Sequence, residues 1–321
     1  MDMISFGPVF LELVFGHVPK LPGPGEEIFT DDFAVSCGGA VTSASAAAAA
    51  GAAAGLCTVL GDDLGSGVVQ EFCTRQGVDL GPALRVRRRS AGISVVLNFD
   101  GDRAFVTHKP PWPEGEAAEA ERWRRVLRQH RPAWCYLHSG PDVPAFLREA
   151  RAQGARTVLD VSLEADSRRD LVTECVRRAD LFVPNEAELC RLTSTDSLAG
   201  AVAAARGWGT PMVVTRGAAG ALVVTADGVT EVRDGVREVE VKDLTGAGDT
   251  FAGAMIGALA QGAPLLAAVA AANAAGAQAV SRLGACGEVE VAGFSSAAQT
   301  LGATLAQSIA AGRLTELGAG P

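Results

Sequence analysis

Short apolar runs alternate with amphipathic segments along the second half of the chain. A helical period predicts helices at 117–129, 144–153 and 170–178. Short apolar runs predict strands at 133–137, 157–161, 181–183, 211–215 and 221–225. Such alternation, with connections of a few residues, is typical of parallel βαβ units. We therefore predict a three-layer α/β/α domain on a mainly parallel central sheet, with ligands at the carboxyl ends of its strands.

The first third of the chain contains additional strand patterns. Strands are predicted at 4–15, 27–30, 33–36, 92–98 and 103–108. The first of these reads as a buried strand with Glu12 near its C-terminal end. The last two flank an Asp-Gly pair at 100–101, which predicts a β-hairpin. One apolar face of this hairpin is expected to carry Ile93, Val95, Leu97 and Phe99.

Two long uncharged stretches, 34–61 and 250–281, consist mainly of Ala and Gly. Each is long enough to cross a bilayer, so a membrane-packed alternative stays open. Pro264 and several amide side chains interrupt the second stretch, and Ala/Gly helices are equally expected where helices press closely on a sheet. We predict helices from Thr250 and from Pro264 to 279, and a last helix at 295–314.

Composition narrows the function classes. The chain has 321 residues, enough for one large core, and a net charge of −9, which disfavours a nucleic-acid or anionic-membrane partner. None of its three lysines follows a glycine, which excludes a Walker A loop. The seven scattered cysteines form no Cys-x-x-Cys pair and indicate a reduced, cytoplasmic protein. No secretory signal is evident at the N-terminus.

Residues 243–253, Asp-Leu-Thr-Gly-Ala-Gly-Asp-Thr-Phe-Ala-Gly, combine a glycine turn with the start of a helix. Helix N-termini carry unpaired N–H groups and partial positive charge, so an anion could approach Gly246, Ala247 and Gly248 closely. Asp249 places a carboxylate at the same point, where it could take a proton from an attacking hydroxyl. The alternative is that Thr245 or Asp249 merely caps the helix.

This segment resembles the C-terminal signature of the ribokinase-like (PfkB) family of carbohydrate and nucleoside kinases. The resemblance implies one ribokinase-like domain over 1–321, with a β-sheet lid from about 15–36 and 91–109. It implies ATP-dependent phosphorylation of a hydroxyl of a sugar or sugar-like molecule, with Asp249 as general base and Gly246 to Gly248 as the anion hole. A homodimer through the lid is also implied. A nucleoside kinase and a catalytically silent metabolite sensor remain as alternatives.

A second set of motifs resembles the acceptor side of this family. Cys37-Gly38-Gly39 leads into an Ala-rich helix, and Gly61-Asp62-Asp63-Leu64-Gly65 follows. The resemblance implies that Glu12, Gly38, Gly39 and Thr42 bind the acceptor. The family has Asp and Asn where Glu12 and Thr42 stand, so we expect an acceptor other than ribose or a simple hexose. A strand-end carboxylate and a tight strand-to-helix turn are the plainer alternatives.

The nucleotide side is represented by three further motifs. By resemblance, Asn185 and Glu188 organise waters around Mg²⁺, and Thr215, Gly217 and Gly220 surround the ATP phosphates and ribose. Asn273 would line the adenine pocket, and Asp243 is a candidate ligand of a monovalent cation. The plainer alternatives are a helix-capping box, a glycine hairpin and a buried amide on a backbone carbonyl. No Gly-x-Gly-x-x-Gly follows the first strand, which disfavours a dinucleotide-dependent dehydrogenase.

Overall fold

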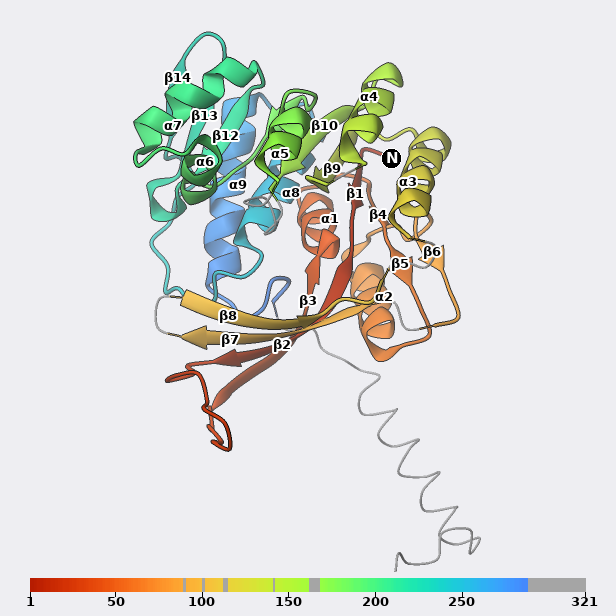
Figure 1. The fold of residues 1–321 in the computed structure, drawn as a ribbon, viewed down its shortest axis with the longest axis vertical. Helices are drawn as coiled ribbons and strands as arrows, with labels where there is room; N and C mark the ends of the chain where they lie inside the picture. The colour runs from red at the N-terminus through yellow and green to blue at the C-terminus, as the bar shows by residue number, and fades with distance from the viewer. Residues whose placement is uncertain (89–90, 100–101, 112–114, 141, 162–167, 288–321) are drawn as a thin grey trace, which may run out of the picture. The chain divides into compact units, whose positions relative to one another are not determined.

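The computed structural model describes residues 1–287 except 89–90, 100–101, 112–114, 141 and 162–167, and its largest element is an eight-stranded sheet (Figure 1). The strand order is β14-β13-β12-β11-β10-β9-β1-β4. The strands are β1 (Met3–Phe6), β4 (Ala54–Cys57), β9 (Trp134–His138), β10 (Arg156–Asp160), β11 (Leu181–Phe182), β12 (Met212–Thr215), β13 (Ala221–Val224) and β14 (Val229–Val232). All pairs from β4 to β12 are parallel, and β13 and β14 form an antiparallel edge. The predicted parallel sheet is confirmed.

Helices cover both faces of this sheet. One face carries α1 (Ala40–Ala49), α8 (Ala247–Ala260) and α9 (Leu265–Val280). The other carries α3 (Glu116–His130), α4 (Val143–Ala152), α5 (Arg169–Val176), α6 (Glu186–Thr193) and α7 (Leu198–Ala205). Because both faces are covered, the central strands are mainly apolar rather than alternating with polar residues. On β9, Cys135 and Leu137 pack toward α4, whereas Trp134 and Tyr136 pack toward α8.

The Ala/Gly stretches form the tightly packed helices α1 and α8. A Cβ atom on Gly253 would lie 2.2 Å from the carbonyl oxygen of Ser43, and one on Gly257 would lie 2.8 Å from that of Ala47. Small residues therefore let the two helices approach to backbone contact. No helix within the described part of the chain is long and apolar enough to cross a membrane. The predicted helix at 295–314 lies outside the described residues.

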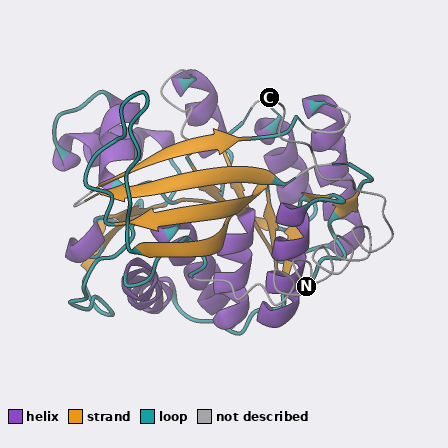
Figure 2. Ribbon diagram, turned by 90° about the horizontal axis from the view of Figure 1, so that it is seen from below, coloured by secondary structure: helices purple, strands orange, loops and turns teal. Residues whose placement is uncertain are grey.

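A separate four-stranded sheet, called the small sheet, has the order β3-β2-β7-β8, and Figure 2 shows it from below. Its strands are β2 (Val9–Gly16), β3 (Asp32–Gly39), β7 (Gly92–Phe99) and β8 (Asp102–His108). The helix α2 (Leu64–Gln76) packs beside β2 and β3, and two short strands, β5 (Val59–Leu60) and β6 (Leu84–Arg85), pair nearby. The predicted hairpin is confirmed as β7 and β8.

Two strand predictions in this region are wrong. The run 4–15 is not one strand: β1 ends at Phe6 in the main sheet, and β2 begins at Val9 in the small sheet. Pro8 lies between them and has no N–H group with which to continue a ladder. Residues 27–30 form a loop, whereas the predicted strand at 33–36 lies within β3.

The two faces of the small sheet differ in composition. Ser94, Val96 and Asn98 of β7 are buried, and the alternate residues Ile93, Val95, Leu97 and Phe99 are half-buried. Cross-strand pairing places Glu12 opposite Ser94, on the buried face, and Leu13 opposite Val95, on the other. The predicted apolar stripe of β7 is therefore on the more exposed face.

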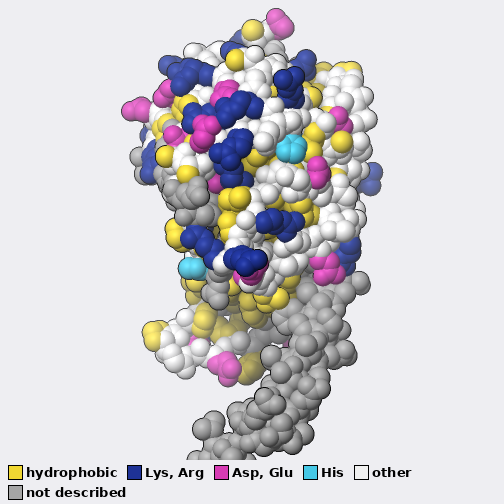
Figure 3. Space-filling model, turned by 90° about the vertical axis from the view of Figure 1, so that its right-hand side faces the viewer, with side chains coloured by type: hydrophobic (Ala, Val, Ile, Leu, Met, Phe, Trp, Pro, Cys, Tyr) yellow, Lys and Arg dark blue, Asp and Glu magenta, His cyan; other side chains and the backbone are white. Residues whose placement is uncertain are grey.

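Charged side chains on the side viewed in Figure 3 are of mixed sign. On α3, Arg122 pairs with Glu119, and Arg128 pairs with Glu121 and with Glu149 of α4. The arginine-rich face of α3 is thus largely paired with carboxylates.

Candidate active site

The glycine turn before α8 adopts a conformation that side chains disfavour. Gly246 has a φ of 71°, and a Cβ atom there would lie 2.5 Å from that of Ala285. A Cβ atom on Gly248 would meet nothing within 4 Å. The N–H of Gly248 donates no hydrogen bond to another described residue. This helix start therefore offers an unpaired donor beside open space, as the predicted anion hole requires.

Neither Thr245 nor Asp249 caps α8. The helix begins at Ala247 after Gly246 without a side-chain cap. Thr245 donates instead to Asp243, through its N–H at 2.8 Å and its hydroxyl at 2.6 Å. The capping alternative for this motif is thereby excluded within the described residues, and the Asp249 carboxylate has other partners.

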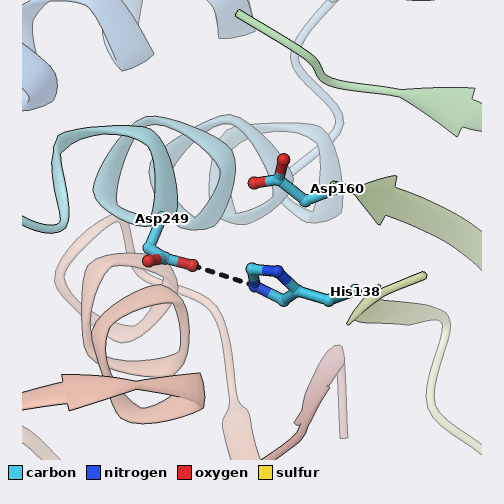
Figure 4. Close-up of side chains that lie close together, drawn as sticks. All are labelled: His138, Asp160 and Asp249. Carbon is cyan, nitrogen blue, oxygen red and sulfur yellow. Dashed lines mark ion pairs between the residues drawn. The ribbon is translucent and has the colours of Figure 1, made fainter. Parts of the chain in front are cut away.

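Its two partners, Tyr136 and His138, lie on β9, and Asp160 of the neighbouring β10 completes the cluster (Figure 4). The Tyr136 hydroxyl lies 2.9 Å from Asp249 Oδ1 and 2.7 Å from Asp160 Oδ2. His138 Nε2 lies 3.4 Å from Asp249 Oδ1. Tyr136 and His138 are two residues apart on β9, and Asp160 ends β10 beside them, so all three side chains face α8.

The cluster places a histidine with a raised pKa beside Asp249. Burial alone would lower the pKa of His138, but the Asp249 hydrogen bond and the charges of Asp160 and Asp249 outweigh it and raise the pKa to about 9. Because 39% of the His138 side chain is exposed, the effect of burial on its pKa is incomplete. His138 is therefore protonated near neutral pH, and it places a positive charge beside the Asp249 carboxylate. Burial also raises the pKa of Tyr136 well above its usual value.

Ligand atoms of His138, Asp160 and Asp249 lie within 4.8 Å of one another. A histidine with two carboxylates is chemically able to bind a divalent ion. Here, however, His138 and Asp249 contact each other, and Tyr136 joins both carboxylates. We interpret the group as a hydrogen-bonded cluster around Asp249. The sequence analysis did not identify Tyr136, His138 or Asp160 as members of this cluster.

The four predicted acceptor residues lie around the N-terminus of α1. Gly39, with a φ of 78°, precedes the helix, and a Cβ atom on Gly38 would lie 1.9 Å from Glu12 Oε1. Glu12 is only 5% exposed and accepts a hydrogen bond from the Ala285 N–H at 3.3 Å. Thr42 is 1% exposed, with its hydroxyl 3.5 Å from Cys286 Sγ. The structure thus brings these residues together beneath residues 285–286.

Burial raises the pKa of Glu12 to about 7; the Ala285 N–H opposes this shift, and the charges of Asp243 and Asp249 add to it. Glu12 is therefore electrostatically coupled to the candidate base, although its carboxylate is almost inaccessible to solvent.

Asp243 clamps the loop before α8 to the segment that covers Glu12. It is 2% exposed, and besides its two bonds to Thr245 it accepts the Gly284 N–H through Oδ2 at 2.8 Å. Ser36 of the small sheet holds the same segment, donating to the Gly287 carbonyl at 2.9 Å and accepting the Cys286 N–H at 3.2 Å. Monovalent-cation binding at Asp243 stays a prediction.

On the nucleotide side, Asn185 and Glu188 form a capping box at the start of α6. Asn185 Oδ1 accepts the Glu188 N–H, and Glu188 Oε2 accepts the Asn185 N–H, both at 2.8 Å. Burial raises the pKa of Glu188. The capping alternative is thus confirmed for this motif, while its relation to a metal stays a prediction.

The other predicted nucleotide residues are placed near this box. Thr215 bridges to Asn185 in parallel register, and its N–H donates to the Pro184 carbonyl at 3.0 Å. Gly217 and Gly220 have positive φ values of 53° and 82°. Asn273 is 8% exposed, and its amide donates to the carbonyls of Val232 and Asp234 at 3.1 and 3.0 Å. Asn273 therefore holds the 232–234 loop against α9.

Comparison with known proteins identifies the family of this chain. The family described as pfkB family carbohydrate kinase matches residues 17–292. Aminoimidazole riboside kinase of Salmonella typhimurium is 30% identical over 248 residues, which are 70% of this chain and 76% of that protein. Cytidine kinase of Thermococcus kodakarensis is 34% identical over 120 residues, 36% of this chain and only 43% of that protein's length.

The fold has matching solved structures. A putative ribokinase II from E. coli in complex with ATP and Mg²⁺ aligns with a TM-score of 0.73 and 22% sequence identity, covering 90% of this chain and 96% of that one. The family match runs from before β3 to beyond α9 and includes the α8 turn, so the chain belongs to the pfkB family of carbohydrate kinases and is an ATP-dependent kinase.

Proposed function

We propose that this chain transfers the γ-phosphoryl group of ATP to a hydroxyl of a sugar or sugar-like small molecule, with Asp249 as general base. The observation that carries this proposal is the placement of Asp249. Its carboxylate stands in the first turn of α8 and is held by Tyr136 and His138. The nearby Gly248 N–H donates to no residue in the described part of the chain.

The proposed step needs positioning and charge stabilisation more than covalent chemistry. As the acceptor oxygen forms its bond to the γ-phosphorus, its proton passes to Asp249. The bond from phosphorus to the β–γ bridging oxygen breaks, and ADP leaves. The N–H groups at Gly246 to Gly248 and the helix dipole would stabilise the negative charge on the transferred group.

ATP and Mg²⁺ would lie on the β11–β12 side of Asp249. Glu188, acting through water, and Asn185 would orient the hydrated Mg²⁺, with Thr215, Gly217 and Gly220 around the phosphates and Asn273 near the adenine. The Asn185–Thr215 bridge supports this, because it places these motifs side by side. When bound, Mg²⁺ would neutralise phosphate charge.

The acceptor class is proposed from Glu12, Thr42 and the relatives. Glu12 is longer than the family's Asp and is turned into contact with Ala285, and Thr42 is buried against Cys286. We propose that ribose and simple hexoses are poor acceptors. A nucleoside or riboside carrying a larger substituent is the second candidate, favoured by the names of the two relatives, cytidine kinase and aminoimidazole riboside kinase.

A panel of pentoses, hexoses and nucleosides with ATP and Mg²⁺ tests both parts. Transfer to one class with a kcat/KM about 10⁴-fold above ribose is expected, because sites built on hydrogen bonds to particular hydroxyls discriminate strongly. Efficient ribose phosphorylation would contradict the acceptor proposal alone. ATP binding without transfer to any acceptor would support the silent sensor instead.

A homodimer through the small sheet is the remaining proposal. The less buried face of that sheet carries apolar side chains, among them Phe33, 50% exposed, and Val106, 69% exposed. Large exposed apolar faces commonly mark protein interfaces. Sedimentation should give a dimer for the unchanged chain and a monomer for Val106→Asp. A monomer at every concentration of the unchanged chain would refute the proposal.

A further inference from the structure

Tyr136 connects two carboxylates with a single hydroxyl. It is fully buried in the middle of β9, and its oxygen lies within 2.9 Å of Asp249 Oδ1 and within 2.7 Å of Asp160 Oδ2. A phenol has one proton and can donate only one of these two hydrogen bonds. The other contact requires a proton on a carboxyl group, since otherwise two oxygen lone pairs would face each other in a buried site.

Asp160 is suited to carry that proton. Its Oδ1 accepts the Val161 N–H at 2.7 Å, which leaves Oδ2 for Tyr136. Burial raises the pKa of Asp160 to about 7; the charge of His138 opposes the shift, and those of Glu188 and Asp249 add to it. With Asp160 protonated, its O–H donates to Tyr136, and the Tyr136 O–H donates to Asp249.

This chain of donors determines which Asp249 oxygen can react. Both Tyr136 and His138 approach Oδ1, whereas no described residue hydrogen-bonds to Oδ2. The acceptor proton would therefore move to Oδ2. Because the carboxylate is held from the main sheet, its orientation does not depend on the loops around the acceptor.

We propose that Tyr136 and Asp160 are a positioning pair that holds Asp249 with Oδ2 turned toward the acceptor hydroxyl. This inference rests on the proposed function, since it assigns an orientation to the proposed base. Neither residue is assigned contact with the substrate.

Steady-state kinetics of three variants test the pair. Tyr136→Phe should lower kcat by about 10- to 100-fold, because small misplacements of a reacting group are costly, and leave the KM for ATP within about twofold. Asp160→Asn should retain most of the activity at neutral pH, since its amide N–H can still donate to Tyr136. Asp160→Ala should resemble Tyr136→Phe.

The pH profile separates positioning from stability. Above the pKa of Asp160 the unchanged enzyme loses the donor to Tyr136, so kcat should decline on the alkaline side, and Asp160→Asn should lack this decline. Thr157→Val is the matched control. Thr157 is on the same strand as Asp160, and its buried hydroxyl donates to Asp180 at 2.8 Å, away from Asp249. Thr157→Val should lower Tm without lowering kcat. An unchanged kcat in Tyr136→Phe, or an equal fall in Thr157→Val, would overturn the proposal.

A measurement on the protein without any acceptor substrate tests the positioning pair separately from the proposed function. Carboxyl resonances of ¹³C-labelled aspartate can be assigned with Asp249→Asn and Asp160→Asn. Tyr136→Phe should displace both assigned resonances, and the Asp160 carboxyl should titrate above the usual aspartate range. An Asp249 resonance indifferent to Tyr136→Phe would refute the positioning pair even if phosphoryl transfer is observed. If Tyr136→Phe displaces both resonances but no acceptor is phosphorylated, only the proposed function would be refuted.

Discussion

Asp249 and Glu188 occupy equivalent local positions but have different partners. Each is an acidic residue in the first turn of a helix that starts at the carboxyl edge of the main sheet. Glu188 turns back on its own helix and accepts the Asn185 N–H. Asp249 accepts from Tyr136, 113 residues earlier in the chain. The contact of Glu188 stabilises its own helix terminus, whereas the contacts of Asp249 join α8 to a strand of the main sheet.

The largest effect that tests this comparison is expected at Asp249. Asp249→Asn keeps the size of the side chain but removes the base, so kcat should fall by about 10²- to 10⁴-fold. The affinity for ATP should change little, and the nucleotide dissociation constant is the control. An undiminished turnover rate would remove Asp249 from the mechanism.

How far the sequence predicts these two sites depends on how local their contacts are. The capping box and the turn around Gly246 lie within a few residues, so local spacing was sufficient to identify them. Tyr136 and His138 alternate with the buried Cys135 and Leu137, which indicates a shared face of β9. The sequence does not say which helix covers that face, because this depends on sheet order and on the packing of α1 and α8.

The small sheet shows the same limit. The β7–β8 pair was predicted because its strands are only two residues apart in sequence, but β2 pairs in parallel with β7, far along the chain. The continuous apolar run at 4–15 gave no sign that the chain changes sheets, except for Pro8. Glu12 then reaches Ala285 because the sheet turns that face inward.

The two glycines of the anion hole give the next largest effect and separate fold from chemistry. Gly246→Ala should destabilise the protein by about 1–3 kcal/mol, because φ is positive there and the new Cβ would meet Ala285. Gly248→Ala should leave stability unchanged or improve it by up to about 1 kcal/mol, because its Cβ points into open space within a helix. It should nevertheless lower kcat if phosphate approaches that backbone. Denaturant unfolding measures the stability of both variants, and steady-state kinetics measure their kcat. An undiminished kcat in Gly248→Ala would show that phosphate does not approach that backbone.

A smaller effect is expected at Glu188. Glu188→Ala should lose about 0.5–2 kcal/mol of stability with the capping box and raise the half-saturating Mg²⁺ concentration by about tenfold. Glu188→Gln is the matched control, because glutamine still accepts the Asn185 N–H in a capping box but has no charge. Glu188→Gln should have the stability of the unchanged chain but the raised half-saturating Mg²⁺ concentration of Glu188→Ala. Recovery of both would leave Glu188 with a structural role only.

The smallest effect concerns the pH dependence of stability. The pKa of His138 is raised from 6.5 to about 9 in the folded state, so its contribution is fully present below pH 6.5 and is lost as pH rises through about 9. The pKa of Asp160 is raised from 3.8 to about 7, so its protonated form stabilises the fold below pH 3.8, and that contribution is lost as pH rises through about 7.

The two titrations therefore act in windows that overlap little, and a single variant separates them. His138→Gln keeps a donor near Asp249 but cannot titrate. Thermal unfolding measured from pH 4 to pH 10 should show that this variant retains the decline in Tm between pH 4 and pH 7 and loses the decline between pH 7 and pH 9. Because the His138 side chain is partly exposed, solvent screening should keep the difference to a few degrees. A variant that still loses stability above pH 7 as the unchanged chain does would show that His138 carries no such charge.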